Sequence, residues 1–370
     1  MSKPVTAYIG LGSNLGDRKN YIDEALKRLG ETETVKLAGV SGIIETVALA
    51  STEQPKYLNA VAELKTTMST ADLHRTLSDI ETELGRARRG HWWPRTIDLD
   101  LLLFGKEILE SPDLTIPHPQ MHLRSFVLKG LCQFNGELLH PVMKVSLNEL
   151  DARLNGCDFA LDPDKPQLVS IAGIIGVGKT TLAEKLADRL DCEVIFEPYD
   201  ENPFLADVYA GKKELALDSE LFFLTGRAKQ LEADKLESGR ICISDYVFGK
   251  ELIYAKRLLD AQQLALFQEI HPQFAGQVAA PVLVIYMHDS AQNCLDRIHS
   301  RNRPYEQQIE LQFLRRLDSD YEQLFKDWKS CPVIRISTSQ CNDVDHLADQ
   351  IKYYVAGHFV TAGGTKQSKI

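Results

Sequence analysis

The sequence has no apolar run that approaches the ~20 residues needed to cross a membrane as a helix. Its first four residues, MSKP, lead into an apolar strand without the long apolar core of a secretory signal, so we expect a cytoplasmic protein. Basic residues are in the minority, with 42 Lys and Arg against 52 Asp and Glu, a net charge of −10. This balance argues against a protein that coats nucleic acid or an anionic membrane, although local basic clusters can still bind phosphates.

Disulfide and zinc patterns are also lacking. The seven cysteines are an odd number and no two form a C-x-x-C pair, so we expect reduced side chains that serve in packing. The ten histidines show no paired spacing on one helical face, which argues against a zinc site. With 44% hydrophobic and 25% charged residues, the composition is that of an ordinary folded protein and excludes disorder as the main state.

The length of 370 residues, at roughly 150 per domain, indicates two or three domains. The stretch 155–167 (NGCDFALDPDKPQ) holds one Gly, two Pro and three Asp, has neither secondary-structure period, and separates two patterned regions. We therefore expect a first domain at 1–158, a linker at 159–166, a second domain at 167–358 and, because it is polar and Gly-rich, a disordered tail at 359–370.

The first region alternates short β-rich runs with two helical patterns. Apolar residues recur with helical period from Ile22 to Leu29 and again from Leu73 to Leu84. This alternation predicts a small α+β sandwich. The expected strands are 5–11, 60–65 and 97–104, and the expected helices end at Gly30 and Gly85.

The second region consists of continuous apolar runs separated by helical stretches. Strands that are apolar throughout are buried on both faces, which is typical of a parallel sheet covered by helices. We therefore expect a doubly wound α/β domain with five parallel strands. The runs are 168–172, 194–196, 241–244, 282–287 and 333–336.

A glycine-rich run follows the first strand of this region. Residues 173–180 (GIIGVGKT) fit the phosphate-loop pattern, and the apolar stripe of a helix begins directly after them. The glycines let backbone N–H groups surround phosphate oxygens, the lysine supplies a charge for the outer phosphates, and the threonine can ligate Mg²⁺. The alternative, a glycine-rich turn with a solvated lysine, is roughly a one-in-a-hundred coincidence. The expected ATP-binding residues are Gly173, Gly176, Gly178, Lys179, Thr180 and Thr181.

Two acids follow strands of the expected parallel sheet. Glu197 comes after the run 194–196, and Asp245 comes after 241–244. Ligands gather at the carboxyl ends of parallel strands, so both acids should face the nucleotide. Each alone could equally be a helix cap or a loop charge, but the shared position beside a phosphate loop favours a functional role.

Three arginines occur close together further along the chain. Arg297 and Arg301 lie four residues apart on one helical face, and Arg303 lies in the turn beyond. Charge-rich helix ends are usually just solvated. Three guanidiniums near a transferred phosphoryl group would, however, stabilise its charge.

At this point the second region resembles the deoxynucleoside kinase family over most of 167–354. The resemblance is carried by the phosphate loop, by 196–198 (FEP), by 202–205 (NPFL), by the helix 220–227 (ELFFLTGR) and by the lid-like run 297–314. It implies that Glu197 accepts the proton of the 5′-hydroxyl. It also implies that Arg227 lies beside base and sugar, that Tyr209 and Glu306 contact the sugar 3′-hydroxyl, and that Arg297, Arg301 and Arg303 form the lid.

Two departures from the family pattern bear on the substrate. Many members carry Glu-Arg-Ser after the third strand, whereas this chain has Ser-Asp-Tyr at 244–246, closer to the bacterial purine deoxynucleoside kinases, and Asp245 is expected at Mg²⁺. The base-reading glutamine is replaced by Glu220. A carboxylate only accepts hydrogen bonds, so Glu220 suits guanine and needs a proton or a water to read adenine. We therefore expect a purine deoxynucleoside, with deoxyguanosine as the first candidate.

Paired carboxylates occur on the last strand of the first region. Asp98 and Asp100 are two residues apart on a strand, so they point to one face, while the alternating Ile97, Leu99 and Leu101 face the core. Such a pair can hold Mg²⁺, and nearby arginines can hold polyphosphate. A solvent-facing edge guarded by charge is the alternative for the two aspartates alone. The basic residues that favour a site are Arg86, Arg88, Arg89, Arg95 and His118.

The first region resembles the 6-hydroxymethyl-7,8-dihydropterin pyrophosphokinase family from about 7 to 150. The matching motifs are 10–15 (GLGSNL), 54–60 (QPKYLNA), 80–86 (IETELGR), 92–100 (WWPRTIDLD) and 116–126 (IPHPQMHLRSF). The resemblance implies a ferredoxin-like α+β sandwich in which Asp98 and Asp100 hold two Mg²⁺ across the triphosphate. The residues implied at the nucleotide or its lids are Glu81, Arg86, Arg88, Trp92, Arg95, His118 and Arg124.

The same resemblance places Thr46, Asn59 and Phe126 at the pterin, with Tyr57 nearby. A flat heteroaromatic ring needs an aromatic side chain for stacking and an amide that both donates and accepts, and Phe126 and Asn59 provide these. Alone, the aromatic residues are more often core and Asn59 could cap a turn. Gln120 and Leu123 stand where the family often has Arg and Glu, which predicts weaker lid closure.

The sequence thus predicts a bifunctional enzyme that uses ATP and Mg²⁺ in both halves and acts on a dihydropterin and a deoxynucleoside. Two alternatives stay open for the second domain: another small-molecule kinase with a phosphate loop, or a non-catalytic nucleotide sensor. Similar kinases are often dimers, so a homodimer through the second domain is an expectation that the sequence does not decide.

Overall fold

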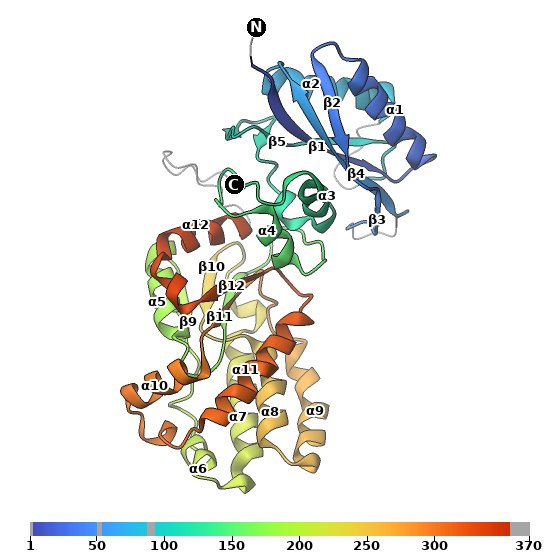
Figure 1. Cartoon of the computed structure of the whole chain (residues 1–370). Coiled ribbons are helices and arrows are strands. Elements are labelled where there is room, and N and C mark those ends of the chain that lie inside the picture. Colours follow the sequence, from blue (N-terminus) through green and yellow to red (C-terminus); the bar gives the residue numbers. More distant parts are fainter. Residues whose placement is uncertain (1–2, 50–53, 87–92, 356–370) are drawn as a thin grey trace. The chain divides into compact units, whose positions relative to one another are not determined.

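The structure is a computed structural model that describes residues 3–49, 54–86 and 93–355. The chain divides into two compact units, Met1–Ala160 and Leu161–Ile370, which are considered separately below (Figure 1). Arg88, Arg89 and Trp92 and the tail expected at 359–370 lie outside the described residues. Among the described helices, none is both long and apolar enough to cross a bilayer.

The first unit is built on an antiparallel sheet with the order β2-β4-β1-β5, and a further strand, β3, pairs with β4. The expected strands are present, although several extend further than their apolar runs. The sheet strands are β1 (Val5–Ser13), β2 (Val35–Val40), β3 (Ile44–Thr46), β4 (Tyr57–Thr66) and β5 (Asp98–Phe104).

Helices cover both faces of this sheet. α1 (Arg18–Glu31) and α2 (Thr70–Glu83) bury their apolar stripes in one core with Leu99 and Leu101 of β5. α3 (Ser125–Asn135) packs against β4 from the other face. Asp98 and Asp100 alternate with the buried leucines and therefore lie on the α3 side. The remaining elements are β6 (Leu109–Glu110), β7 (Thr115–Ile116), η1 (Met121–Leu123) and α4 (Leu147–Leu154).

The second unit is built on a parallel sheet of five strands in the order β12-β11-β8-β10-β9. This confirms the parallel α/β arrangement predicted from the apolar runs. All six residues of the central strand β8 are buried, as expected for a strand covered on both faces. The strands are β8 (Gln167–Ala172), β9 (Glu193–Ile195), β10 (Ile241–Ser244), β11 (Leu283–His288) and β12 (Val333–Ser337).

Helices connect these strands, with α5 packed against α12 and α7 packed against α8 and α9 (Figure 1). The seven cysteines are all free, as predicted. The helices are α5 (Lys179–Leu190), α6 (Leu205–Tyr209), α7 (Ala216–Gln230), α8 (Glu251–Leu258), α9 (Ala261–Ala275), α10 (Ala291–Arg301), α11 (Leu311–Lys326) and α12 (Val344–Tyr354). Short 3₁₀ turns are η2 (Lys213–Leu215), η3 (Ala233–Lys235), η4 (Phe248–Lys250), η5 (Pro304–Glu306) and η6 (Thr338–Asn342).

Candidate functional sites

The glycine-rich run of the second unit forms a tight loop between β8 and the first turn of α5. Gly173, Gly176 and Gly178 all have positive φ, at 141°, 83° and 100°. A β-carbon at Gly176 would lie 2.4 Å from the carbonyl oxygen of Cys294, so the backbone passes this neighbour too closely for a side chain. The loop ends at a helix N-terminus, where free N–H groups bind phosphate oxygens.

Replacing Gly176 by Ala is expected to destabilise the second unit by about 2 kcal/mol or more and to weaken ATP binding, because strained φ and a backbone clash add together. The matched control is Gly211→Ala, since Gly211 also has positive φ, +97°, but its added β-carbon would meet nothing within 4 Å. Thermal unfolding and ATP titration of both variants measure the difference. Equal effects of the two substitutions would contradict the close-approach argument.

Lys179 and Thr180 follow the loop, and both are held by polar contacts. The Nζ atom of Lys179 donates to the carbonyl oxygens of Gly173 and Ile174, at 3.0 and 3.1 Å. The Thr180 hydroxyl donates to Oδ2 of Asp245 at 2.6 Å. A hydroxyl and a carboxylate beside a phosphate loop are ligands that Mg²⁺ accepts together with phosphate oxygens. Among the described residues no three His, Cys, Asp or Glu side chains gather as a metal cluster, so phosphates and water would complete the coordination.

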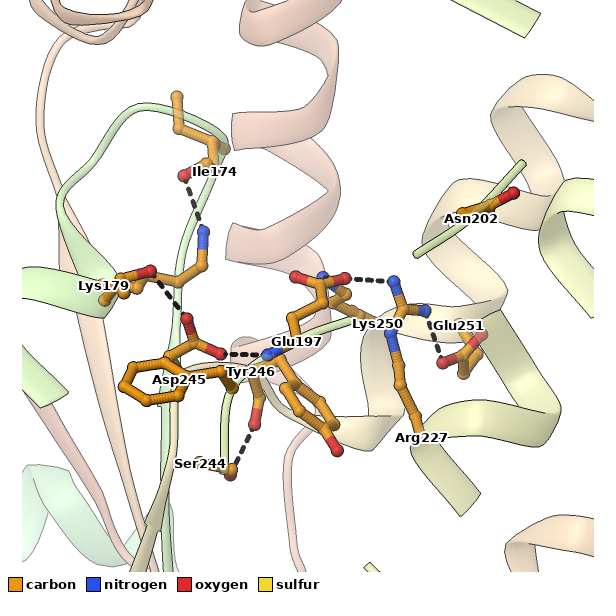
Figure 2. A network of polar contacts seen from close by, with 12 residues as sticks. Ile174, Lys179, Glu197, Asn202, Arg227, Ser244, Asp245, Tyr246, Lys250 and Glu251 are labelled. Carbon is orange, nitrogen blue, oxygen red and sulfur yellow. Dashed lines mark hydrogen bonds and ion pairs between the residues drawn. The ribbon is translucent and has the colours of Figure 1, made fainter. Parts of the chain in front are cut away.

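Glu197 lies at the centre of a buried network of charges (Figure 2). Its backbone N–H donates to Oδ1 of Asp245 at 2.8 Å. Its carboxylate accepts a hydrogen bond from Nζ of Lys250 at 2.5 Å and forms an ion pair with Arg227. Arg227 also pairs with Glu251, at 2.5 Å. Burial alone would raise the pKa of Glu197, but Arg227, Lys250 and Lys179 outweigh burial and hold it well below its usual value.

One pocket collects most of the residues predicted for this unit. Its wall holds the loop, the strand-end acids, the implied sugar and base contacts and two of the three arginines. Arg301 pairs with Glu306 at 2.6 Å, and Arg303 donates to the hydroxyl of Tyr199 at 2.6 Å. The predicted residues that line the pocket are Gly176, Lys179, Thr180, Glu197, Tyr209, Glu220, Arg227, Asp245, Arg301, Arg303 and Glu306.

The structure does not bring all three arginines together. Arg297 lines a neighbouring depression with Gly178 and Thr181, where it forms an ion pair with Asp289. Its position four residues before Arg301 places both on α10, but their side chains enter different pockets. Arg297 also donates a hydrogen bond, at 3.3 Å, to the carbonyl oxygen of Gly176, a loop residue that lines the pocket of Arg301 and Arg303. The lid of three arginines stays a prediction.

Lys250 is a charged residue of this pocket that the sequence did not indicate. It lies in η4, is 3% exposed, and contacts Glu197 and the ring of Tyr254. Burial, reinforced by the charge of Arg227, lowers the pKa of Lys250 to about 8. No motif points to this lysine, because its role depends on the turn that brings η4 back to Glu197.

The candidate site of the first unit lies on the sheet face opposite the α1–α2 core. In the sheet, Gly12 of β1 is the register partner of both Asn59 of β4 and Asp98 of β5, and Gly10 pairs with Asp100. A β-carbon at Gly12 would lie 3.1 Å from Oδ1 of Asn59. Because Gly10 and Gly12 have no side chains, they leave space between the Asn59 amide and the carboxylates of Asp98 and Asp100.

Asp98 is held between two arginines. Its carboxylate oxygens lie 2.7 Å from Arg86 and 2.6 Å from Arg95. Asp100 is exposed, and Oδ1 of this residue lies 4.0 Å from Nε2 of His118. Burial, together with the charge of Asp100, raises the pKa of Asp98 to about 7 despite the arginines. A divalent cation between the two carboxylates would relieve this repulsion, so the pair fits the expected metal.

The expected pterin residues lie in the same pocket. Nδ2 of Asn59 donates to the hydroxyl of Thr46 at 2.9 Å, which fixes the amide, and Tyr57 and Phe126 line the pocket beside it. The pocket is lined by Thr46, Tyr57, Asn59, Arg86, Arg95, Asp98, Asp100, His118, Arg124, Phe126 and further residues.

Two details differ from the sequence expectation. Glu81, expected at the nucleotide, is 5% exposed and lies behind the pocket wall, where it pairs with Arg86 and accepts a hydrogen bond from the Leu99 N–H at 2.7 Å. It positions Arg86 and β5. Asp158, at the end of the expected first domain, also lines the pocket and accepts a hydrogen bond from the N–H of Ser125 at 2.6 Å. The loop-like composition around Asp158 gave no sign of this role.

A phosphate loop facing strand-end acids in one unit, and paired aspartates among arginines in the other, place the chain among the kinases. Residues 8–136 match the family model described as 7,8-dihydro-6-hydroxymethylpterin-pyrophosphokinase (HPPK), and residues 169–356 match the deoxynucleoside kinase family model. The chain belongs to both families, with one in each unit.

Two sequence relatives, one for each half, support this assignment. The chain is 43% identical over 127 residues to 2-amino-4-hydroxy-6-hydroxymethyldihydropteridine pyrophosphokinase of Bacillus subtilis, a match that covers 34% of this chain and 76% of that protein. It is 34% identical over 195 residues to deoxyguanosine kinase of the same organism, which covers 51% of this chain and 94% of that protein. A solved deoxyadenosine kinase from M. mycoides aligns with 50% of this chain and 95% of its own, at 24% identity and a TM-score of 0.44.

Proposed function

We propose that the chain is a bifunctional ATP-dependent enzyme. The first unit transfers pyrophosphate from ATP to 6-hydroxymethyl-7,8-dihydropterin, a step in folate biosynthesis, and the second phosphorylates the 5′-hydroxyl of a deoxynucleoside. The observation that carries the proposal is that each unit surrounds its own pocket with its own acids and phosphate-binding cations. The relative named deoxyguanosine kinase supports a purine as the base.

In the first unit, the residues position two substrates and neutralise charge. Asp98 and Asp100 would hold Mg²⁺, whose positive charge would neutralise negative charge on the triphosphate. Arg95 and Arg124 face the phosphates from the pocket wall, while Asn59 reads the polar edge of the pterin. The pterin hydroxymethyl oxygen attacks the β-phosphorus, and the bond from that phosphorus to the α–β bridging oxygen breaks. AMP leaves with that oxygen, and the hydroxyl proton passes to solvent. No covalent enzyme intermediate is needed, since positioning and charge neutralisation lower the barrier.

In the second unit, Glu197 orients the acceptor hydroxyl. Because Arg227 and Lys250 keep it ionised, it accepts a hydrogen bond from the 5′-hydroxyl. It takes up the proton as the 5′-oxygen bonds to the γ-phosphorus of ATP, while the bond from that phosphorus to the β–γ bridging oxygen breaks and ADP leaves. Thr180 and Asp245 would hold Mg²⁺, which supplies charge for the phosphates. Lys179 exchanges its two loop carbonyls for phosphate oxygens. In a loose transition state the new oxygen–phosphorus bond is barely formed, so a strong base is not required. A carboxylate with a low pKa, such as Glu197, is therefore sufficient.

The test is to assay the full chain with each acceptor and to identify the nucleotide product. We expect AMP when the dihydropterin is supplied and ADP when a purine deoxynucleoside is supplied, with both activities lost on chelation of Mg²⁺. A chain that releases no AMP with the pterin would contradict the first assignment. A clear preference for pyrimidine deoxynucleosides would contradict the purine assignment.

Several finer features stay proposals. The order β1-α1-β2-β4-α2-β5 along the chain, with the sheet order β2-β4-β1-β5, supports a ferredoxin-like arrangement of the first unit. The domain limits at 158 and 167, the cytoplasmic location and a homodimer through the second unit are predictions from the sequence and from family resemblance.

A further inference from the structure

Glu220 is a buried acid in the deoxynucleoside pocket for which the proposed reaction has no use. It lies on α7, is 2% exposed, and lines the pocket together with Phe223 and Tyr254. Its Oε2 atom is buried without a hydrogen-bond partner, and among the described residues it forms no ion pair. The other glutamates of the pocket, Glu197 and Glu306, are both paired. An unpartnered acid in a ligand pocket points to the ligand.

The charges around Glu220 balance without it. Arg227 and Lys250 are two cations, and Glu197 and Glu251 are the two anions that pair with them. An ionised Glu220 would add one uncompensated negative charge to a buried site, which is costly, whereas the neutral acid adds none. In agreement, burial and the charge of Glu251 raise the pKa of Glu220 to about 8. The groups around it are Arg227 on α7, Lys250 in η4, Glu251 and Tyr254 on α8, Tyr209 on α6 and Glu197 after β9.

The two protonation states of a carboxyl recognise different bases. A neutral acid offers one O–H donor and one acceptor, which matches the N1 acceptor and N6 amino group of adenine. An ionised carboxylate offers two acceptors, which matches the N1–H and N2 amino group of guanine. The two tyrosines beside Glu220, Tyr209 and Tyr254, cannot distinguish the bases by a change of charge. Burial raises the pKa of both well above its usual value and leaves them as neutral hydroxyls.

We propose that Glu220 selects the purine through its proton: the neutral acid takes deoxyadenosine, and binding of deoxyguanosine expels that proton to solvent. The inference rests on the proposed function of the second unit and specifies its substrate. Because the deoxyguanosine complex holds one proton fewer, rising pH favours deoxyguanosine and falling pH favours deoxyadenosine.

The experiment measures the ratio of kcat/KM for deoxyguanosine to that for deoxyadenosine, with the full chain and saturating Mg-ATP, from about pH 6.5 to about 8.5. Ionisations that affect both substrates equally cancel in this ratio. One linked proton predicts a rise of about tenfold per pH unit. Glu220→Gln, whose amide does not ionise, is expected to give a ratio independent of pH. The matched control Glu214→Gln changes an exposed glutamate and should keep the wild-type slope.

A second measurement counts the proton directly. Calorimetric titration of the wild-type chain in two buffers of different ionisation enthalpy should show proton release with deoxyguanosine at about pH 7 and none with deoxyadenosine. A flat ratio, no proton release, or a slope that survives Glu220→Gln would overturn the inference while leaving the kinase assignment intact. Absence of phosphorylation of both nucleosides at every pH would overturn both. The proton count on the wild type decides the matter even where Glu220→Gln fails to fold.

Discussion

Replacing Glu197 by Gln is expected to lower deoxynucleoside phosphorylation by about a thousandfold and to leave the pterin reaction unchanged. The amide keeps the shape of the side chain but removes the charge that accepts the 5′-hydroxyl proton, and a positioned general base contributes typically 10² to 10⁴. The measurement is kcat for each activity on the same purified chain. The pterin activity therefore serves as an internal measure of enzyme quantity.

The control for this substitution is Glu193→Gln, an exposed glutamate at the start of β9, the strand that precedes Glu197. It makes the same chemical change four residues earlier and should alter neither reaction. Loss of charge at Glu197 also leaves Arg227 and Lys250 with one partner fewer, so unfolding and ATP binding are measured in parallel. A Glu197→Gln chain that binds ATP, melts like the wild type and still phosphorylates deoxynucleosides at the normal rate would remove Glu197 from the mechanism.

Asp98→Asn should produce the reciprocal result: a loss of about a thousandfold in pyrophosphate transfer, with deoxynucleoside phosphorylation intact. The amide preserves a hydrogen-bond acceptor for Arg86 and Arg95 but removes one of the two negative charges that would hold Mg²⁺. The loss of a metal ligand removes several kcal/mol of charge stabilisation from the transition state. AMP release at saturating and at limiting Mg²⁺ is the measurement.

The Asp113→Asn substitution, at an exposed residue of the first unit, is the matched control and should leave both activities unchanged. The alternative is that Asp98 only positions Arg86 and Arg95 and does not bind the metal. In that case, a higher Mg²⁺ concentration would not restore activity to the Asp98→Asn chain. The residual rate of this chain would also depend on Mg²⁺ as the wild-type rate does. That outcome would assign Asp98 to arginine positioning.

Local patterns predicted much of both sites, because their signals are contained in short segments. The loop ending at Lys179 and the alternation that separates Asp98 and Asp100 from Leu99 follow from residue spacing alone. Glu197 and Asp245 could be predicted because the ends of parallel strands meet at one edge, and here they are joined by a hydrogen bond.

The residues that escaped prediction depend on contacts between distant segments. Lys250 reaches Glu197 across 53 residues of sequence, and Asp158 returns across 33 residues to Ser125. The ion pair of Arg297 with Asp289 joins residues of different segments, and the helical period does not specify it. Glu81 was predicted at the nucleotide from family resemblance, whereas its burial follows from the way α2 packs beside β5.

The paired charges of Glu197, Arg227, Lys250 and Glu251 bear on how this enzyme can evolve. Replacing one of these four residues by an apolar residue leaves an oppositely charged side chain buried without its partner. In buried ion pairs this change lowers the free energy of unfolding by roughly 3–5 kcal/mol. Selection should therefore remove single substitutions at these four positions. Homologues that differ at one of them should also differ at its partner. Descendants are expected to inherit the quartet as a unit.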